Sequence, residues 1–161
     1  IHVARTAALR LCIALSDIQG VCMSASAFPH ELDGRDDQVR QLLPPGGKVR
    51  QFARNFLDLR ANIGRTPLAE ALIDSEYTLL RRKEPRKILV VLTDGDPDCR
   101  TSCSPIINRM MRSRIEVIGM GIEVMSYPDL FPRFAVVSKV SNLEAALFKV
   151  LQSTLLRKKA A

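Results

Sequence analysis

The stretch KILVVLTDGDPD, from Lys87 to Asp98, decides the fold. Its five consecutive apolar residues, Ile88 to Leu92, run directly into Thr93-Asp94-Gly95-Asp96. A short unbroken apolar run rich in β-branched residues predicts a strand buried on both faces, as in the centre of a parallel sheet. Such sheets place their ligand chemistry just beyond the carboxyl ends of the strands. Asp94 stands at that point, and Gly95 behind it allows the backbone to turn.

A carboxylate at this place needs a partner, and few cations lie close to Asp94 in the sequence. A bound metal ion is therefore the leading interpretation of Asp94. The alternative, an aspartate that only caps the following turn, stays open at this point.

The remaining segments alternate between helical and strand patterns, which predicts a doubly wound, Rossmann-like α/β fold with a mostly parallel sheet flanked by helices. Two helices carry the start signal of a hydroxyl cap followed by proline, at Thr66-Pro67 and Ser104-Pro105. The expected helices are 2–19, 49–59, 66 to the basic run before Pro85, one from 104, and 142–156, and the expected strands are 21–28, 39–43, 88–93, 115–122 and 134–137.

The composition is that of one ordinary soluble domain spanning residues 1–161, with 47% hydrophobic and 25% charged residues. No apolar run is long enough to cross a bilayer, so no membrane association is expected. The four cysteines are too few and too scattered for a disulfide scaffold, which favours a reduced, cytoplasmic setting. The net charge of +7 comes largely from basic clusters at 81–83, 86–87 and 157–159. These clusters lack interleaved aromatic residues, so a solvated basic face is favoured over nucleic-acid binding.

Two loops at predicted sheet ends offer oxygen ligands, the hydroxyl of Thr66 in Gly64-Arg65-Thr66-Pro67 and the carboxylate of Asp94. Hard divalent cations such as Mg²⁺ take all-oxygen shells and retain several waters. Thr66 could equally be a helix cap without any role at a metal. Asp96 and Asp98 could add outer carboxylates, or could bond the amides of their own loop or lie in solvent. Cys99 and Cys103 are not expected to bind a metal, since a zinc site needs about four ligands.

The order of several motifs carries a family resemblance. These motifs are the segment 3–29, GRTPLAEAL at 64–72, KILVVLTDGDPD at 87–98, IEVIGMGI at 115–122 and SKVSNLEAALFKVL at 138–151. On these motifs, the chain resembles a von Willebrand factor A (VWA) domain over nearly its whole length. The resemblance implies a metal-ion-dependent adhesion site (MIDAS), whose ligands in the family are an Asp-x-Ser-x-Ser after the first strand, a threonine and a later aspartate. The last two match Thr66 and Asp94.

The Asp-x-Ser-x-Ser motif is absent, and Cys22-Met-Ser24-Ala-Ser26 has its spacing only by coincidence. By the resemblance, the motif and the central first strand would lie upstream of Ile1, which makes the chain a C-terminal fragment of a longer protein. Without that strand, two long strands are expected to lack ladder partners. Alternatively, another chain could fill the place in an oligomer, or the sheet could close in an altered order. The fragment alone is expected to bind metal weakly or not at all.

The resemblance implies a non-catalytic protein–protein interaction domain that binds an acidic side chain of another protein through the ion. In this interpretation Gly95 and Asp96 surround the ligands, and Gly64 and Arg65 line the partner-binding rim. The similarity is to bacterial intracellular A domains, including those of chelatase subunits and of proteins that work with AAA+ ATPases. The alternative is an Mg²⁺-dependent phosphoryl-transfer or hydrolytic enzyme using Asp94 and Asp96. No phosphate-binding loop with a lysine supports that alternative.

Overall fold

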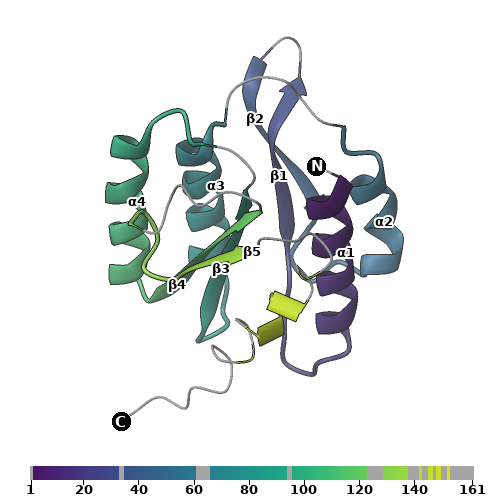
Figure 1. Ribbon diagram of the computed structural model, residues 1–161. Helices are drawn as coiled ribbons and strands as arrows, with labels where there is room; N and C mark the ends of the chain where they lie inside the picture. Colours follow the sequence, from purple (N-terminus) through teal and green to yellow (C-terminus); the bar gives the residue numbers. More distant parts are fainter. Residues whose placement is uncertain are drawn as a thin grey trace.

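The computed structural model describes residues 2–32, 35–60, 66–93, 96–122 and 129–137, with 142, 145, 146, 148, 149 and 152. Figure 1 shows the order of the elements along the chain. They are α1 (His2–Ser16), β1 (Ala25–Leu32), β2 (Arg35–Leu43), α2 (Val49–Leu57), α3 (Leu68–Leu80), β3 (Lys87–Thr93), α4 (Arg100–Arg112), β4 (Ile115–Ile122) and β5 (Phe134–Val137). The predicted α/β class is confirmed.

The strands form two sheets. β1 and β2 make an antiparallel hairpin, while β3, β4 and β5 make a parallel sheet in the order β3-β4-β5. The β3–β4 ladder is regular from Lys87 opposite Ile115 to Thr93 opposite Gly121. Among the described residues, β1 pairs only with β2 and β3 pairs only with β4. Within these residues β1 and β3 therefore each have one edge without a ladder partner, and the missing strand between them stays a prediction.

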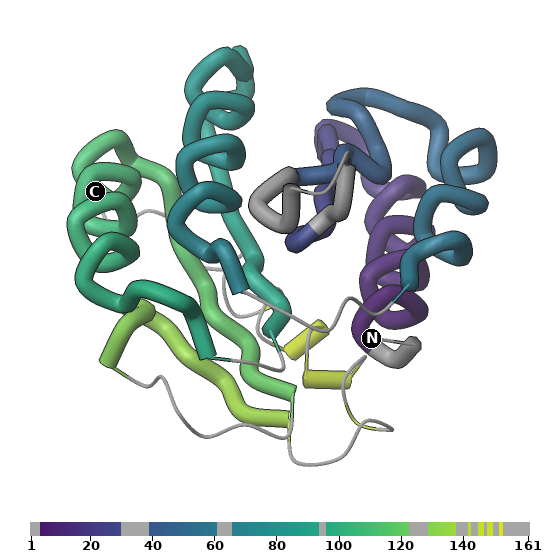
Figure 2. Tube along the Cα trace, turned by 90° about the horizontal axis from the view of Figure 1, so that it is seen from above, coloured from purple at the N-terminus to yellow at the C-terminus, as the bar shows by residue number. Residues whose placement is uncertain are grey.

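Helix α1 joins the two sheets on one face. Its Ala7 packs in a cluster with Ile118 and Met120 of β4, whereas its Cys12, about one and a half turns later, packs with Leu43 of β2. The other face carries α3 and α4, which bury apolar side chains against β3 and β4. Figure 2 shows these two helices on one side of the strands, with α1 and α2 on the other. Phe28 of β1 packs against the α3–α4 cluster, so both faces hold the two sheets together.

Burial along β3 differs from the prediction. Ile88, Leu89 and Val90 are only half-buried, and the strand becomes buried at Val91 and Thr93. The fully covered strand is β4, which has β3 and β5 on its two sides. β3 does pack on both faces, with Ile88 and Val90 against the Ala7–Ile118 cluster and Leu89 against the α3–α4 cluster. These side chains are only half-buried because β3 is an edge strand in the described part of the chain.

The helix starts also differ from the prediction. α3 begins at Leu68, with Pro67 at the N-cap and no side-chain capping bond, so Thr66 is not the cap. α4 begins at Arg100, one turn before the predicted start, and holds Pro105 in its interior at the loss of one backbone hydrogen bond. The additional turn carries Cys103 into the core, where it is completely buried.

The predicted helix 142–156 lies mostly outside the described residues, although 145, 146, 148, 149 and 152 have helical backbone. No helix in the described part of the chain is long and apolar enough to cross a membrane.

Candidate functional site

The loop after β3 meets the segment before α3 through a reciprocal pair of hydrogen bonds. The amide of Thr66 donates to Oδ1 of Asp98 at 2.8 Å, and the amide of Asp98 donates to the carbonyl of Thr66 at 3.1 Å. Thr66 is thereby held beside the loop that follows β3, at the carboxyl end of the parallel sheet. The metal hypothesis required these two loops to share one rim of the sheet, and the Thr66–Asp98 pair brings them together.

The residues on this rim are only partly described. Gly64, Arg65, Asp94 and Gly95 lie outside the described residues, so their roles stay predictions. Asp96 is described, and its carboxylate pairs with Arg100 at 3.0 Å. Both side chains are more than half exposed, so this pair contributes little stability and can separate easily.

Asp98 was considered from the sequence as an outer carboxylate, as a partner of its own loop's amides, or as a solvated side chain. Its carboxylate accepts from an amide 32 residues earlier in the chain, a contact that none of these three predictions included. Aspartate commonly bonds nearby backbone amides, which is the signal that the sequence offered. The identity of this distant amide depends on tertiary structure, and no local pattern contains it.

Cys99 was considered from the sequence as a metal ligand, and the lowered pKa of its thiol was not foreseen. It lies exposed at the N-cap of α4, with Sγ 3.0 Å from Oγ of Ser102 and 3.1 Å from Oγ1 of Thr101. These hydrogen bonds lower the pKa of the Cys99 thiol from 9.0 to about 7. Desolvation by burial has the opposite effect on Cys103, whose pKa is raised to about 11. The surroundings of Cys99 therefore favour its thiolate form, whereas those of Cys103 favour the protonated thiol.

The donor atoms of the rim suit a hard cation in type but not in number. A hydroxyl and carboxylates are the ligands that Mg²⁺ and similar ions take in proteins. The residues that the structure describes contain no group of three or more His, Cys, Asp or Glu able to hold a metal ion. Thr66 and Asp94 would supply two protein oxygens, and a protein-built octahedral site needs further ligands or waters.

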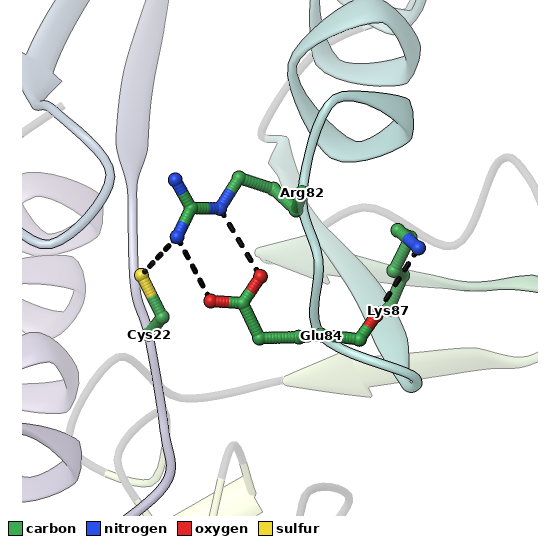
Figure 3. Close-up of polar contacts among 4 residues, drawn as sticks. All are labelled: Cys22, Arg82, Glu84 and Lys87. Atoms are coloured by element: carbon green, nitrogen blue, oxygen red, sulfur yellow. Dashed lines mark hydrogen bonds and ion pairs between the residues drawn. The ribbon is translucent and has the colours of Figure 1, made fainter.

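The opposite edge of the sheet carries the contact drawn in Figure 3. Arg82 donates to both carboxylate oxygens of Glu84, at 2.8 and 3.2 Å, and to Sγ of Cys22 at 3.2 Å, while Lys87 donates to the carbonyl of Glu84 at 3.1 Å. The hydrogen bond from Arg82 lowers the pKa of Glu84 to about 2. Because Cys22 precedes β1 and Arg82 precedes β3, this contact links the two sheets near the amino ends of β1 and β3.

Comparisons with known proteins identify relatives in structure only. No protein-family model matches the chain, and no curated protein matches it in sequence. A structure of proximal thread matrix protein 1 from the mussel byssus superposes with a TM-score of 0.68 at 13% identity, over 93% of this chain and 41% of that chain. The chain thus spans about two-fifths of the length of that protein. Another structure of the mussel protein is described as having a zinc-occupied MIDAS motif.

Two further structures have the same fold. The VWA domain of SpRpn10 has a TM-score of 0.66 at 10% identity, covering 92% of this chain and 79% of that chain. The manganese-loaded TRAP protein of Plasmodium vivax has a TM-score of 0.64 at 16% identity, covering 89% of this chain and 63% of that one. These identities are too low to carry function across, and the likeness is one of fold. The chain has a VWA-like α/β fold.

Proposed function

We propose that this chain forms the greater part of a VWA-type protein-interaction domain, which binds an acidic side chain of a partner protein through a divalent cation. The observation that supports this most directly is the Thr66–Asp98 pair, because it holds the threonine loop against the loop that contains Asp94. A non-catalytic role agrees with the absence of a nucleophile paired with a base in the sequence.

In this proposal the hydroxyl of Thr66 and the carboxylate of Asp94 hold the ion, and Gly95 and Asp96 surround them. Gly64 and Arg65 flank the surface on which the partner binds. Mg²⁺ is the proposed ion, because oxygen donors with retained waters are its usual surroundings. The bound ion would supply a positive charge with an exchangeable water position that a carboxylate of the partner can occupy.

We further propose that one additional strand lies between β1 and β3 and completes the sheet. In the part of the chain that the structure describes, β1 and β3 each have one edge whose backbone N–H and C=O groups lack a ladder partner. α1 packs against both sheets on one face, and Phe28 reaches the α3–α4 cluster on the other, so the place between the sheets is covered on both sides. A strand there would bury the half-exposed Ile88, Leu89 and Val90. By the family resemblance, it would also bring the remaining ligands to the rim.

The biological setting is proposed from the resemblance alone: a bacterial, cytoplasmic protein that serves as a subunit of a chelatase or works with an AAA+ ATPase. One source of the additional strand would be the same protein. A second chain supplying the strand, which would make the protein an oligomer, is the competing source.

The interaction is tested with the intact protein immobilised and its partners captured in the presence of Mg²⁺. Asp94→Ala and chelation of the metal should each abolish capture, while the matched control Asp74→Ala, at an exposed position of α3, should capture as well as the parent. Circular dichroism should show that Asp94→Ala retains the fold. Capture that is unchanged by both the substitution and the chelator would refute the metal-mediated mechanism.

The additional strand is tested separately by amide hydrogen exchange on the intact protein. In a parallel ladder, alternate amides of β3 point toward β4 and away from it. With a strand in place, both sets should exchange slowly. Rapid exchange of the set that points away from β4 would show that the edge is open and that no strand is present there.

A further inference from the structure

The edge of the molecule opposite the Thr66 rim concentrates positive charge. α3 leads into β3 and α4 into β4, and because β3 and β4 are parallel, the carboxyl ends of both helices lie at the amino ends of the strands (Figure 1). We define the basic edge as residues 81–87, 112–116 and Arg133. It holds eight Lys or Arg and two Glu, a local charge of +6, compared with +7 for the whole chain.

The two carboxylates of the basic edge are already bound by arginines. Glu84 accepts from Arg82 at 2.8 Å, and Glu116 is contacted by Arg86 at 2.7 Å and by Arg133 at 3.6 Å. They therefore do not neutralise the other cations of this edge. Those that are largely exposed to solvent are Arg81, Lys83, Arg112 and Arg114.

Stabilisation of helix ends does not account for this concentration. Basic residues in the last turn of a helix interact favourably with its dipole, and α4 has Arg109 and Arg112 there. The last turn of α3 has none, and Lys83 and Arg114 lie beyond the ends of the helices. The effect of the dipole falls off within one turn, so these positions need another explanation.

An exposed apolar stripe on α3 leads to the basic edge. Ile73, Tyr77 and Leu80 are 50%, 61% and 50% exposed, and their spacing of four and three residues places them on one side of the helix. The stripe is about 10 Å long, since each helical residue rises 1.5 Å. At its lower end the guanidinium of Arg81 lies 5.0 Å from the centre of the Tyr77 ring, which joins the stripe to the cations.

We propose that the stripe and the basic edge together bind an acidic, amphipathic segment of a partner protein. Apolar side chains of that segment would lie on the stripe, and its carboxylates would reach the basic edge. The edge already binds carboxylates in this manner: Arg82 uses two N–H groups on the two oxygens of Glu84, which is the geometry of strong arginine–carboxylate pairs.

Two other polyanionic surfaces fit less well. Single-stranded nucleic acids use exposed aromatic faces for stacking, and one face of the Tyr77 ring is covered by Arg81. A flat anionic membrane could touch the basic edge, but Ile73 lies about 10 Å away from it along the side of a helix. A segment of a partner protein can contact both the apolar stripe on α3 and the basic edge.

The test measures binding of a fluorescein-labelled 20-residue peptide of Glu and Leu at amphipathic helical spacing, by anisotropy with the intact protein. We expect binding that persists with a chelator and weakens at least tenfold between 50 and 300 mM salt, on the order expected for several charge contacts. Lys83→Glu with Arg112→Glu should weaken binding about tenfold or more, and Tyr77→Ser should also weaken it. The control Arg50→Glu, at an exposed position of α2, should leave the affinity within about twofold of the parent.

Persistence with a chelator separates this surface from the proposed metal-mediated one. A Lys83→Gln and Arg112→Gln variant repeats the test without charge reversal in case the first variant unfolds. No peptide binding at 50 mM salt, an equal loss in Arg50→Glu, or tighter binding to duplex DNA or to phosphatidylserine-containing vesicles than to the peptide would each overturn the proposal.

Discussion

Gly119→Ala in the middle of β4 should destabilise the protein strongly. A Cβ at position 119 would lie 2.3, 2.5 and 2.9 Å from three ring atoms of Phe131, which is far inside ordinary contact distance. The ring has little room to withdraw, because Phe131 is only 4% exposed and stacks on Phe134 at 6.1 Å between centroids. The backbone of Gly119 is also held, since its amide donates to the carbonyl of Arg133 at 2.9 Å.

The magnitude follows from two opposing terms. Overpacking a core by one methyl group typically costs about 1–3 kcal/mol, and the three short contacts place this site at about 3. Alanine in a strand is otherwise favoured over glycine by about 0.5–1 kcal/mol. The expected loss in the free energy of unfolding is therefore about 2 kcal/mol, or roughly 4–8 °C in Tm for a domain of this size.

Urea unfolding followed by circular dichroism measures this loss, and a double-mutant cycle identifies its cause. Phe131→Leu replaces the ring with a smaller aliphatic side chain, so Gly119→Ala should cost about 1 kcal/mol less in that background than in the parent. Val136→Ala on the neighbouring strand, at a position 41% exposed, serves as the control and should cost less than about 1 kcal/mol. A Gly119→Ala protein as stable as the parent, or strictly additive effects in the cycle, would refute the packing argument.

Three further outcomes follow from individual contacts. Glu76→Gln should lower the free energy of unfolding by about 1–2 kcal/mol, because the buried carboxylate accepts from Nε of Arg109 at 2.9 and 3.0 Å, whereas Asp74→Asn on the same helix should change it little. Asp98→Ala should cost about 1 kcal/mol through loss of the bond to the amide before α3, and Asp98→Asn, which keeps an acceptor oxygen, should recover much of it in urea unfolding. Alkylation of Cys99 by iodoacetamide, followed by peptide mass spectrometry, should reach half its maximal rate near pH 7, because the thiolate is the reactive form and its pKa is lowered to about 7. Equal reactivity of the buried thiol four residues later would contradict this assignment.

Much of the fold could be predicted from local pattern. The strands β3, β4 and β5 lie within one residue of the predicted segments, because continuous apolar, β-branched runs are a strong local signal. The first strand was predicted at 21–28 and is observed at Ala25–Leu32. Its second half, Pro29-His30-Glu31, is polar and contains proline, so composition favoured a loop. Pairing with β2 decides this segment instead.

The candidate site could likewise be predicted only in part from local sequence. Thr66 could be selected from the sequence because it stands before a helix in a pattern that resembles a family site, but its predicted capping role was wrong. What holds Thr66 is Asp98, whose bond partner no local pattern contains. Position 119 likewise needs a glycine because the ring of Phe131, in the loop before β5, packs against its Cα.

The sequence by itself determined the class of fold and the order of its elements, because the periodicity of apolar residues is a property of neighbours in the chain. Only the tertiary structure decided which backbone and side-chain groups join the loops at the rim, and that eight basic residues gather at one edge. Those features arise from contacts between segments tens of residues apart, and the free energy that selects them comes from packing the whole chain.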